Sequence, residues 1–241
     1  MYEPKQLMTQ LVFLVIILWV ASGFWACSPS SDVTSKVDAL FASFNKTDSP
    51  GCVVVVVQNG NVVYKKGFGM ANLDYDIPIT STSVFDIASV SKQFTGMAIA
   101  MLVEERKIAL TDDIRKYIPS LPDFGKKVTV RNLVDHTSGI RDWAAMMGYA
   151  GRDFEDVSTY EEILRMAEHQ RELNFAPGAE YSYSNAGYTL LAEIVARVGK
   201  QTYPDWMKTN VFDPLGMKST LFYDDHQRIV KNRAYSFFKA N

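Results

Sequence analysis

Residues 85–105, FDIASVSKQFTGMAIAMLVEE, decide most of what this chain can be. From Ser89 onward the apolar residues recur at helical spacing, at Phe94, Met97, Ala98, Met101 and Leu102. Ser89 and Lys92 stand three residues apart at the start of this pattern, so both lie on one face of the first turn. The pattern predicts a buried helix that begins at Ser89, with a lysine ammonium within reach of a serine hydroxyl.

Two interpretations of Ser89 follow from this placement. Ser89 is either the N-cap of the helix, with Lys92 in solvent, or a nucleophile that Lys92 activates. In the second case the helix N-terminus adds free N–H groups and partial positive charge, which favour an oxyanion. To act as a base, a lysine must first lose its proton, which requires burial or a neighbouring cation. The three-residue spacing alone does not decide between these interpretations, because Ser43 and Lys46 have the same spacing at the end of the first expected helix.

A second polar cluster, PGAEYSYSNAGY at residues 177–188, precedes another apolar helical pattern. The phenol of Tyr183 can relay a proton to or from a serine hydroxyl if a cation lowers its pKa. The amide of Asn185, two residues on, can bind both a substrate carbonyl and the lysine. The alternative is a tyrosine-rich loop that packs its rings on the core.

Together, S-x-x-K at a helix start and a later Y-x-N resemble the serine β-lactamase and penicillin-binding-protein superfamily. More narrowly, they resemble its branch of class C β-lactamases, D-Ala-D-Ala carboxypeptidases and esterases. The resemblance runs over residues 35–235 and includes VRNLVDHTSGI (130–140) and FAPGAEYSYSNAGYTLLAEIV (175–195). The sequence holds no G-x-S-x-G elbow and no glycine-rich phosphate loop that would suggest a competing family.

The resemblance implies a role for each residue of the two motifs. Ser89 would be the acylated nucleophile, and Lys92 its proton acceptor or activating cation. Tyr183 would be the general base shared with Lys92 and would activate water in deacylation, while Asn185 would orient the substrate amide or ester. The backbone N–H of Ser89 would supply half of an oxyanion hole. His136 is expected to shape the helical subdomain rather than take part in the chemistry.

The expected elements run in the order helix, hairpin and long helical region, which is an α+β arrangement. A helix is expected over residues 35–44 and a hairpin over residues 51–72, with its turn at Asn59-Gly60. Five consecutive valines suggest a strand buried on both faces. Further helices are expected in residues 130–140, 158–173 and 186–199, and residues 141–157 are expected to be a loop that shapes the pocket. The resemblance implies a β-lactamase-like fold, with an antiparallel sheet flanked by helices and a mostly helical subdomain.

The superfamily's third motif, Lys or His followed by Thr or Ser and then Gly, is expected on a strand after Y-x-N. It is absent from the sequence, since GKKVTV (125–130) has another order and precedes Y-x-N. The resemblance implies that this strand also carries the second oxyanion N–H. We therefore expect residues 35–241 to form a β-lactamase-related domain that lacks its C-terminal part, with an incomplete sheet.

Residues 1–27 predict a targeting segment. Lys5 precedes the unbroken apolar run LVFLVIILWVA (11–21), which is short for a membrane span and suits the core of a signal peptide. Cys27, followed by a polar linker at residues 28–34, suggests a lipidated cysteine; cleavage and an uncleaved membrane anchor are the alternatives. Each version places the globular part outside the cytoplasm, in the periplasm or at the membrane.

Composition limits the remaining possibilities. The 241 residues include 25 basic and 27 acidic ones, scattered along the chain, so no nucleic-acid partner is expected. Two cysteines, Cys27 and Cys52, are too few for a disulfide framework. The three histidines are far apart, and neither a metal nor another cofactor is expected.

These observations favour an exported serine hydrolase. It would act through an acyl-enzyme on a β-lactam, a D-Ala peptide of the peptidoglycan type or a small ester. The alternative is a catalytically silent remnant, or a binding or sensor module of the same fold.

Overall fold

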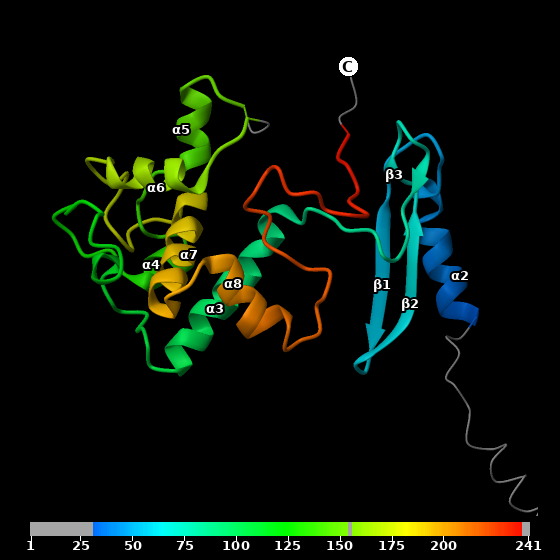
Figure 1. Cartoon of the computed structure of the whole chain (residues 1–241), viewed down its shortest axis with the longest axis horizontal. Helices are drawn as coiled ribbons and strands as arrows, with labels where there is room; N and C mark the ends of the chain where they lie inside the picture. The colour runs from blue at the N-terminus through cyan, green and yellow to red at the C-terminus, as the bar shows by residue number, and fades with distance from the viewer. Residues whose placement is uncertain (1–30, 154–155, 238–241) are drawn as a thin grey trace, which may run out of the picture. The chain divides into compact units, whose positions relative to one another are not determined.

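The structure, a computed structural model, describes residues 31–153 and 156–237 (Figure 1). The expected targeting segment and Cys27 lie outside the described residues. The described chain forms two compact units, which we call the sheet unit (residues 31–86 and 230–237) and the helical unit (Ile87–Ile229). Strands precede a run of helices along the chain, so the α+β arrangement is confirmed. Among the described residues, no helix is both long and apolar enough to cross a membrane.

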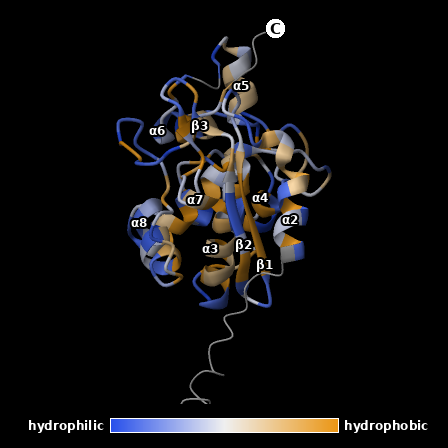
Figure 2. Ribbon diagram, turned by 90° about the vertical axis from the view of Figure 1, so that its right-hand side faces the viewer, coloured by the Kyte–Doolittle hydropathy of each residue, from blue (hydrophilic) through white to orange (hydrophobic). Residues whose placement is uncertain are grey.

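The sheet unit is built around the expected hairpin, in which β1 (Cys52–Gln58) pairs antiparallel with β2 (Asn61–Phe68). The turn residues Asn59 and Gly60 have φ values of 50° and 77°. Asparagine and glycine tolerate these left-handed values better than other residues. The hairpin prediction is therefore confirmed. Figure 2 shows β1 as a largely hydrophobic strand beside the more hydrophilic β2.

One face of the hairpin packs against α2 (Ser31–Leu40). Tyr64 donates a hydrogen bond to the Asp38 carboxylate, and the rings of Phe41 and Phe68 lie 5.7 Å apart. Helix α2 begins earlier than expected, so residues 31–34 are its first turn and not part of a linker. An Asp32–Lys36 ion pair and a bond from Ser35 Oγ to the Asp32 carbonyl stabilise that turn.

The other face of β1 does not follow the prediction of a strand buried on both sides. Val55 and Val57 are 47% and 60% exposed. Register explains the exposure of Val55, which lies opposite Lys65 and thus on the other face from Tyr64 and Lys66, whose side chains bond Asp38 of α2. At Val57 the pairing with β2 shifts register. Among the described strands β1 pairs only with β2. The valine run thus marks a strand with one covered face in the described part of the chain.

Three further segments complete the sheet unit. The 3-10 helix η1 (Ala42–Phe44) follows α2, and the short strands β3 (Met70–Asn72) and β4 (Ile77–Pro78) form a second antiparallel pair that the sequence did not predict. Residues 232–235 return to this unit. There the backbone N–H of Tyr235 donates to Ala71 O at 2.8 Å.

Helix α7 (Asn185–Gly199) is the centre of the helical unit (Figure 1). Five other helices pack on it: α3 (Lys92–Glu104), α4 (Val130–Val134), α5 (Trp143–Tyr149), α6 (Tyr160–Glu168) and α8 (Tyr203–Met207). Leu191 and Ile194 have no exposed surface. Burying one such side chain contributes about 1.5–3 kcal/mol to the free energy of unfolding. The apolar side chains of α7 therefore hold the helix in place.

The first helix of this unit, α3, buries its predicted face at Ala98 and Leu102, which have no exposed surface, and differs from the prediction at Met97. Met97 is 41% exposed, whereas Thr95 and Ile99 are buried. The Thr95 hydroxyl can be buried because it shares a hydrogen bond of 2.8 Å with the hydroxyl of Tyr203.

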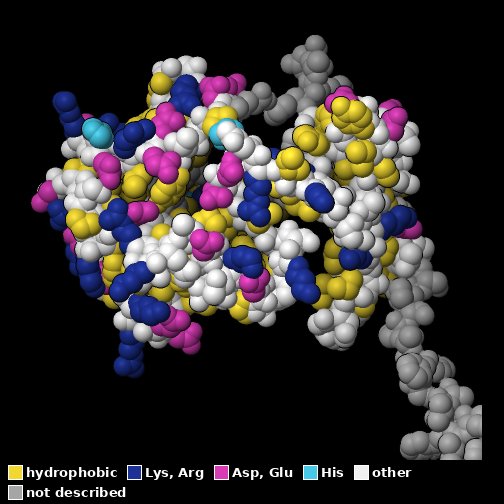
Figure 3. Space-filling model, in the orientation of Figure 1, with side chains coloured by type: hydrophobic (Ala, Val, Ile, Leu, Met, Phe, Trp, Pro, Cys, Tyr) yellow, Lys and Arg dark blue, Asp and Glu magenta, His cyan; other side chains and the backbone are white. Residues whose placement is uncertain are grey.

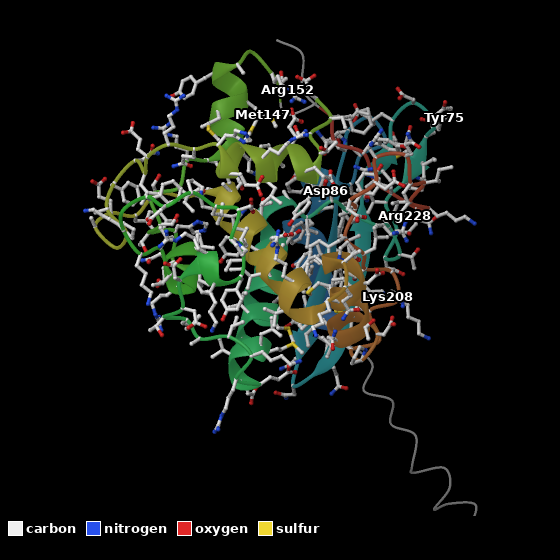
Figure 4. The ribbon with its side chains drawn as sticks, turned by 60° about the vertical axis from the view of Figure 1, so that its left-hand side comes forward. Tyr75, Asp86, Met147, Arg152, Lys208 and Arg228 are labelled. Atoms are coloured by element: carbon white, nitrogen blue, oxygen red, sulfur yellow. The ribbon has the colours of Figure 1, made fainter. Side chains whose placement is uncertain are left out.

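Residues 141–157, expected to be a loop, contain helix α5. Two side chains that Figure 4 labels, Met147 and Arg152, contact residues that follow α5 in the chain. Arg152 forms an ion pair with Glu162 and donates to Val157 O at 2.7 Å, and Ser158 Oγ lies 3.1 Å from Met147 Sδ. The expected helix over residues 158–173 is shorter, at Tyr160–Glu168, and Thr159 caps it by accepting from the Glu162 N–H at 3.2 Å. On the face in view in Figure 3, basic and acidic side chains are interspersed.

The end of α7 provides a test of this packing. A Cβ added at Gly199 would lie 2.3 Å from Trp206 Cδ1, and Trp206 is only 3% exposed. We expect Gly199→Ala to lower the free energy of unfolding by about 1–3 kcal/mol. Urea denaturation of the whole chain measures this change. Gly148→Ala is the matched control, because a Cβ there meets nothing within 4 Å; equal destabilisation by both variants would contradict the packing.

Candidate active site

Ser89 lies in the 3-10 helix η2 (Ala88–Ser91), which runs directly into α3. In a 3-10 helix residues i and i+3 eclipse one another, so the Lys92 side chain stands over Ser89. Lys92 Nζ donates to Ser89 Oγ at 3.2 Å. The preceding Ala88 has a φ of 45°, a strained value for a residue with a side chain. The predicted helix start therefore exists, with its first turn tighter than an α-helix.

Tyr183 and Asn185 reach the same two side chains from the start of α7. The Tyr183 hydroxyl donates to Ser89 Oγ at 2.7 Å, and Lys92 Nζ donates to Asn185 Oδ1 at 2.8 Å. Lys92 Nζ also lies 4.7 Å from the centre of the Tyr183 ring. All four residues predicted from the two motifs are thus in one cluster within the helical unit.

The charge of Lys92 changes the titration of its neighbours. Partial burial raises the pKa of Tyr183, but hydrogen bonding with Lys92 and Ser89, together with the Lys92 charge, outweighs this effect and places the pKa below the ordinary value. Asp142 opposes this change through its negative charge. The net direction favours the phenolate, the form of Tyr183 that can accept a proton from Ser89.

His136 lies directly behind Tyr183. Its ring is 4.6 Å from the Tyr183 ring and 5.1 Å from the Tyr188 ring, which it stacks on, and its Nδ1 accepts from the Ser184 N–H at 3.1 Å. Burial and the Lys92 charge lower the pKa of His136. A neutral imidazole is required for Nδ1 to accept, so His136 supports Tyr183 as an uncharged ring.

The segment around His136 also aligns the Tyr183 segment through its backbone. The N–H of Ser182 donates to His136 O at 2.9 Å, and the N–H of Gly178 donates to Thr137 O at 2.8 Å. Gly139, with φ 72°, accepts from the Asn174 N–H at 2.8 Å. A Cβ at Gly139 would lie 2.3 Å from Phe175 O, so only glycine allows this approach. These contacts agree with the expectation that the His-Thr-Ser-Gly loop shapes the helical subdomain.

Asp142 also belongs to the cluster, although neither of the two sequence motifs includes it. Its Oδ1 accepts from the backbone N–H of Asn185 at 2.5 Å, and its Oδ2 accepts from Asn185 Nδ2 at 3.3 Å. An aspartate just before the apolar residues of α5 is a helix-start signal. That signal would have indicated a cap for α5, not a contact with α7.

Residues 37–235 match the model of the beta-lactamase family. The chain belongs to the beta-lactamase family. The resemblance to the serine β-lactamase and penicillin-binding-protein superfamily is therefore confirmed, together with the β-lactamase-like fold.

Several known members of the superfamily are similar to this beta-lactamase-family chain. Penicillin-binding protein 4* of Bacillus subtilis (strain 168) is 31% identical over 189 residues, which are 78% of this chain and 41% of that protein. The octameric penicillin-binding protein homologue from Pyrococcus abyssi is 32% identical, with a TM-score of 0.71 over 84% of this chain and 47% of that one. The D-amino acid amidase from Ochrobactrum anthropi SV3 is 25% identical, with a TM-score of 0.71 over 85% of this chain and 56% of that one.

The chain therefore spans less than half the length of the curated relatives it matches. The S-x-x-K that begins at Ser89 lies beside Y-x-N in the helical unit, whereas the repeat that begins at Ser43 lies in η1 of the sheet unit. Among the described residues, only the first of these two motifs has hydrogen bonds to the residues of Y-x-N.

From the lowered pKa of His136 we predict how the free energy of unfolding depends on pH. Below the ordinary value of 6.5 the unfolded chain takes up a proton at this residue and the folded chain resists it. Stability from His136 is therefore present above pH 6.5 and lost as the pH falls through the lower folded pKa. We expect His136→Asn to reduce this acid-side loss, since asparagine keeps an acceptor and tolerates the φ of 55°.

Urea denaturation at several pH values on both sides of 6.5 measures this difference. His136→Ala is the companion variant. It leaves the Ser184 N–H without its acceptor and should cost about 1–3 kcal/mol at neutral pH. An unchanged acid-side slope in His136→Asn would contradict the assignment.

Proposed function

We propose that this protein is an exported serine hydrolase that acts through an acyl-enzyme formed at Ser89. The observation that supports this most is the convergence on Ser89 Oγ of Lys92 Nζ at 3.2 Å and the Tyr183 hydroxyl at 2.7 Å. An N-cap serine with a solvated lysine would have neither the phenol nor the Lys92–Asn185 contact. The geometry thus favours the nucleophile interpretation over the capping one.

In the proposed acylation step, the Tyr183 phenolate takes the proton of Ser89 while Oγ attacks the substrate carbonyl carbon. Lys92, bonded to Ser89 and near the Tyr183 ring, stabilises the negative charge during this transfer. Tyr183 then returns the proton to the leaving group. A bond from carbon to Oγ has formed and the bond from carbon to the leaving group has broken. In deacylation Tyr183 accepts a proton from water, and Ser89 regains a hydrogen when its ester is cleaved.

The proposed substrate is a β-lactam, a D-Ala peptide or a small ester. The similar proteins include penicillin-binding proteins and a D-amino acid amidase. One further structure at 26% identity is EstCE1, a hydrolase with promiscuous acyltransferase activity. These names describe penicillin binding, amidase activity and acyltransferase activity, which supports acyl transfer as the reaction class. We propose that the whole protein both forms the acyl-enzyme and hydrolyses it.

Export is proposed from the sequence of residues 1–27. The apolar run and Cys27 favour a signal peptide, a lipid anchor or an uncleaved membrane anchor. Each would place the helical unit where peptidoglycan-type substrates occur, in the periplasm or at the membrane surface.

The proposal predicts covalent labelling at one serine. A fluorophosphonate or a fluorescent penicillin should label the folded chain, and Ser89→Ala should abolish the labelling because the attacking oxygen is gone. Ser43→Ala is the matched control, since it removes the serine of the other S-x-x-K and should label as the wild type does. Gel fluorescence and intact mass report the label, and circular dichroism confirms folding. Labelling that persists in Ser89→Ala, or a folded wild-type chain without labelling, would contradict the proposal and favour a silent module.

Tyr183 as the base predicts a particular pH dependence. The phenolate is the active form, so the labelling rate should rise with pH and level off through an apparent pKa below the ordinary value of 10.0. Tyr183→Phe should lose this limb and slow labelling by roughly 100- to 10,000-fold. Stopped-flow labelling across pH measures both effects. Tyr181→Phe, in the same segment and 70% exposed, should keep the wild-type profile; if Tyr183→Phe also keeps it, Tyr183 is not the base.

A further inference from the structure

Asp142 stands at the N-cap position of α5 but does not cap that helix. An aspartate in this position ordinarily accepts from a backbone N–H in the first turn of its own helix. Here α5 receives no side-chain cap bond from Asp142. The carboxylate turns instead to α7, where both of its oxygens accept from one residue, Asn185.

The two bonds to Asn185 have different consequences. The bond from the backbone N–H, at 2.5 Å, satisfies a free donor at the start of α7 and places negative charge at the helix N-terminus. Any acceptor could supply that bond. The bond from Asn185 Nδ2, at 3.3 Å, acts on the side chain and decides which way its amide faces. Since a carboxylate only accepts, the amide nitrogen must face Asp142.

The orientation of the Asn185 amide determines what Lys92 meets. With its nitrogen toward Asp142, Asn185 presents Oδ1 to Lys92 Nζ at 2.8 Å. A flipped amide would present a donor to the ammonium and another acceptor to the carboxylate, and both contacts would repel. The amide is therefore polarised between a cation and an anion, an arrangement in which each hydrogen bond strengthens the other. Nδ2 has two hydrogens, and Asp142 occupies one of them.

We propose that Asp142 is the positioning residue of this site, which fixes the Asn185 amide with its oxygen on Lys92 and one N–H left for the substrate carbonyl. Asp142 itself touches neither Ser89 nor Tyr183 through a hydrogen bond and acts through Asn185. This inference rests on the proposed function, because it gives Asn185 a substrate to bind.

The loop that carries Asp142 is built to hold it in place. The backbone N–H of the neighbouring Arg141 donates to Gln170 Oε1 at 3.2 Å, and the Arg141 side chain bonds Asn174 and Glu172 at 3.1 and 3.2 Å. Gln170 is buried, at 5% exposure. The carboxylate position is therefore set by contacts outside the catalytic cluster, as a positioning role requires.

Asp142→Asn is the sharpest variant because it exchanges one oxygen for an NH₂ group at nearly constant shape. Its remaining oxygen can still accept from the Asn185 backbone N–H, so α7 stays capped. Its nitrogen cannot accept from Asn185 Nδ2, so the amide loses its fixed direction. Ser184→Ala is the matched control: it removes another cap of α7, the bond from the Gly187 N–H at 3.2 Å, and leaves the Asn185 amide untouched.

The first readout is spectroscopic and independent of activity. In the wild-type protein, nitrogen-15 NMR should show the two side-chain amide protons of Asn185 well separated, one of them downfield and slow to exchange. The resonances are assigned by their absence in Asn185→Asp. In Asp142→Asn they should converge and exchange faster, and in Ser184→Ala they should stay as in the wild type. A wild-type spectrum without a protected Asn185 amide proton overturns the inference whatever the variants do.

The second readout is the rate of fluorophosphonate labelling at Ser89. It should fall by up to about 100-fold in Asp142→Asn, the size of effect expected when a reacting group is misplaced, and stay near the wild-type rate in Ser184→Ala. Equal losses in both variants would show that Asp142 only caps α7. If the wild-type chain does not label at all, the proposed function fails, while the amide spectrum still decides the role of Asp142.

Discussion

The burial of α7 is the constraint on which the helical unit and its site depend. Five helices pack on this one element, and its inward side chains, such as Leu191 and Ile194, have no contact with solvent. A helix held in this way cannot slide or rotate without opening the core. Its first residue, Asn185, and the preceding Tyr183 are therefore fixed relative to α3. Core packing, rather than the polar contacts, brings the two motifs together.

Within that frame the polar residues around Lys92 have complementary tasks. Ser89 and Asn185 give the ammonium two oxygen acceptors, and the aromatic faces of Tyr183 and Tyr188 lie at 4.7 and 5.5 Å. The cation lowers the pKa of Tyr183, and it adds to the larger effect of burial in lowering the pKa of His136. The Lys92 charge thus prepares a phenol to give up its proton and helps burial to keep the supporting imidazole neutral. Asp142, beyond Asn185, supplies the countercharge without bonding the nucleophile.

How much of this could be predicted from the sequence depends on the range of each contact. The Ser89–Lys92 pair follows from local helical spacing, and the Asn59-Gly60 turn follows from local backbone preference. The contact of Ser89 with Tyr183 spans 94 residues, and no spacing rule predicts it. It came from resemblance to a family. His136 was placed correctly in the subdomain but its stacking on Tyr183 was not foreseen.

The errors have the same origin. Asp142 looked like an ordinary residue of a loop, because its partners lie on another helix. The buried face of α3 was predicted at Ala98 and Leu102 but not at Thr95, because burial of Thr95 depends on Tyr203, a contact that hydrophobic periodicity does not detect. The valines of β1 suggested burial on both faces, but exposure depends on which strands and helices lie beside them. In each case local pattern indicated the element, and distant partners determined its surroundings.

All the residues of the candidate site lie in one of the two units. Ser89, Lys92, Tyr183 and Asn185 all belong to the helical unit, and so do His136 and Asp142, which support them. The proton path proposed for acylation therefore needs no side chain from the sheet unit. The start of α7 positions Tyr183 and Asn185, and the core of the same unit positions α7. The activation of Ser89 therefore depends on the same packing that stabilises the helical unit. Loss of a single cap, such as the bond from the Gly187 N–H to Ser184, leaves this core packing in place, whereas a substitution that opens the core around α7 acts on the position of the nucleophile's partners as well as on stability.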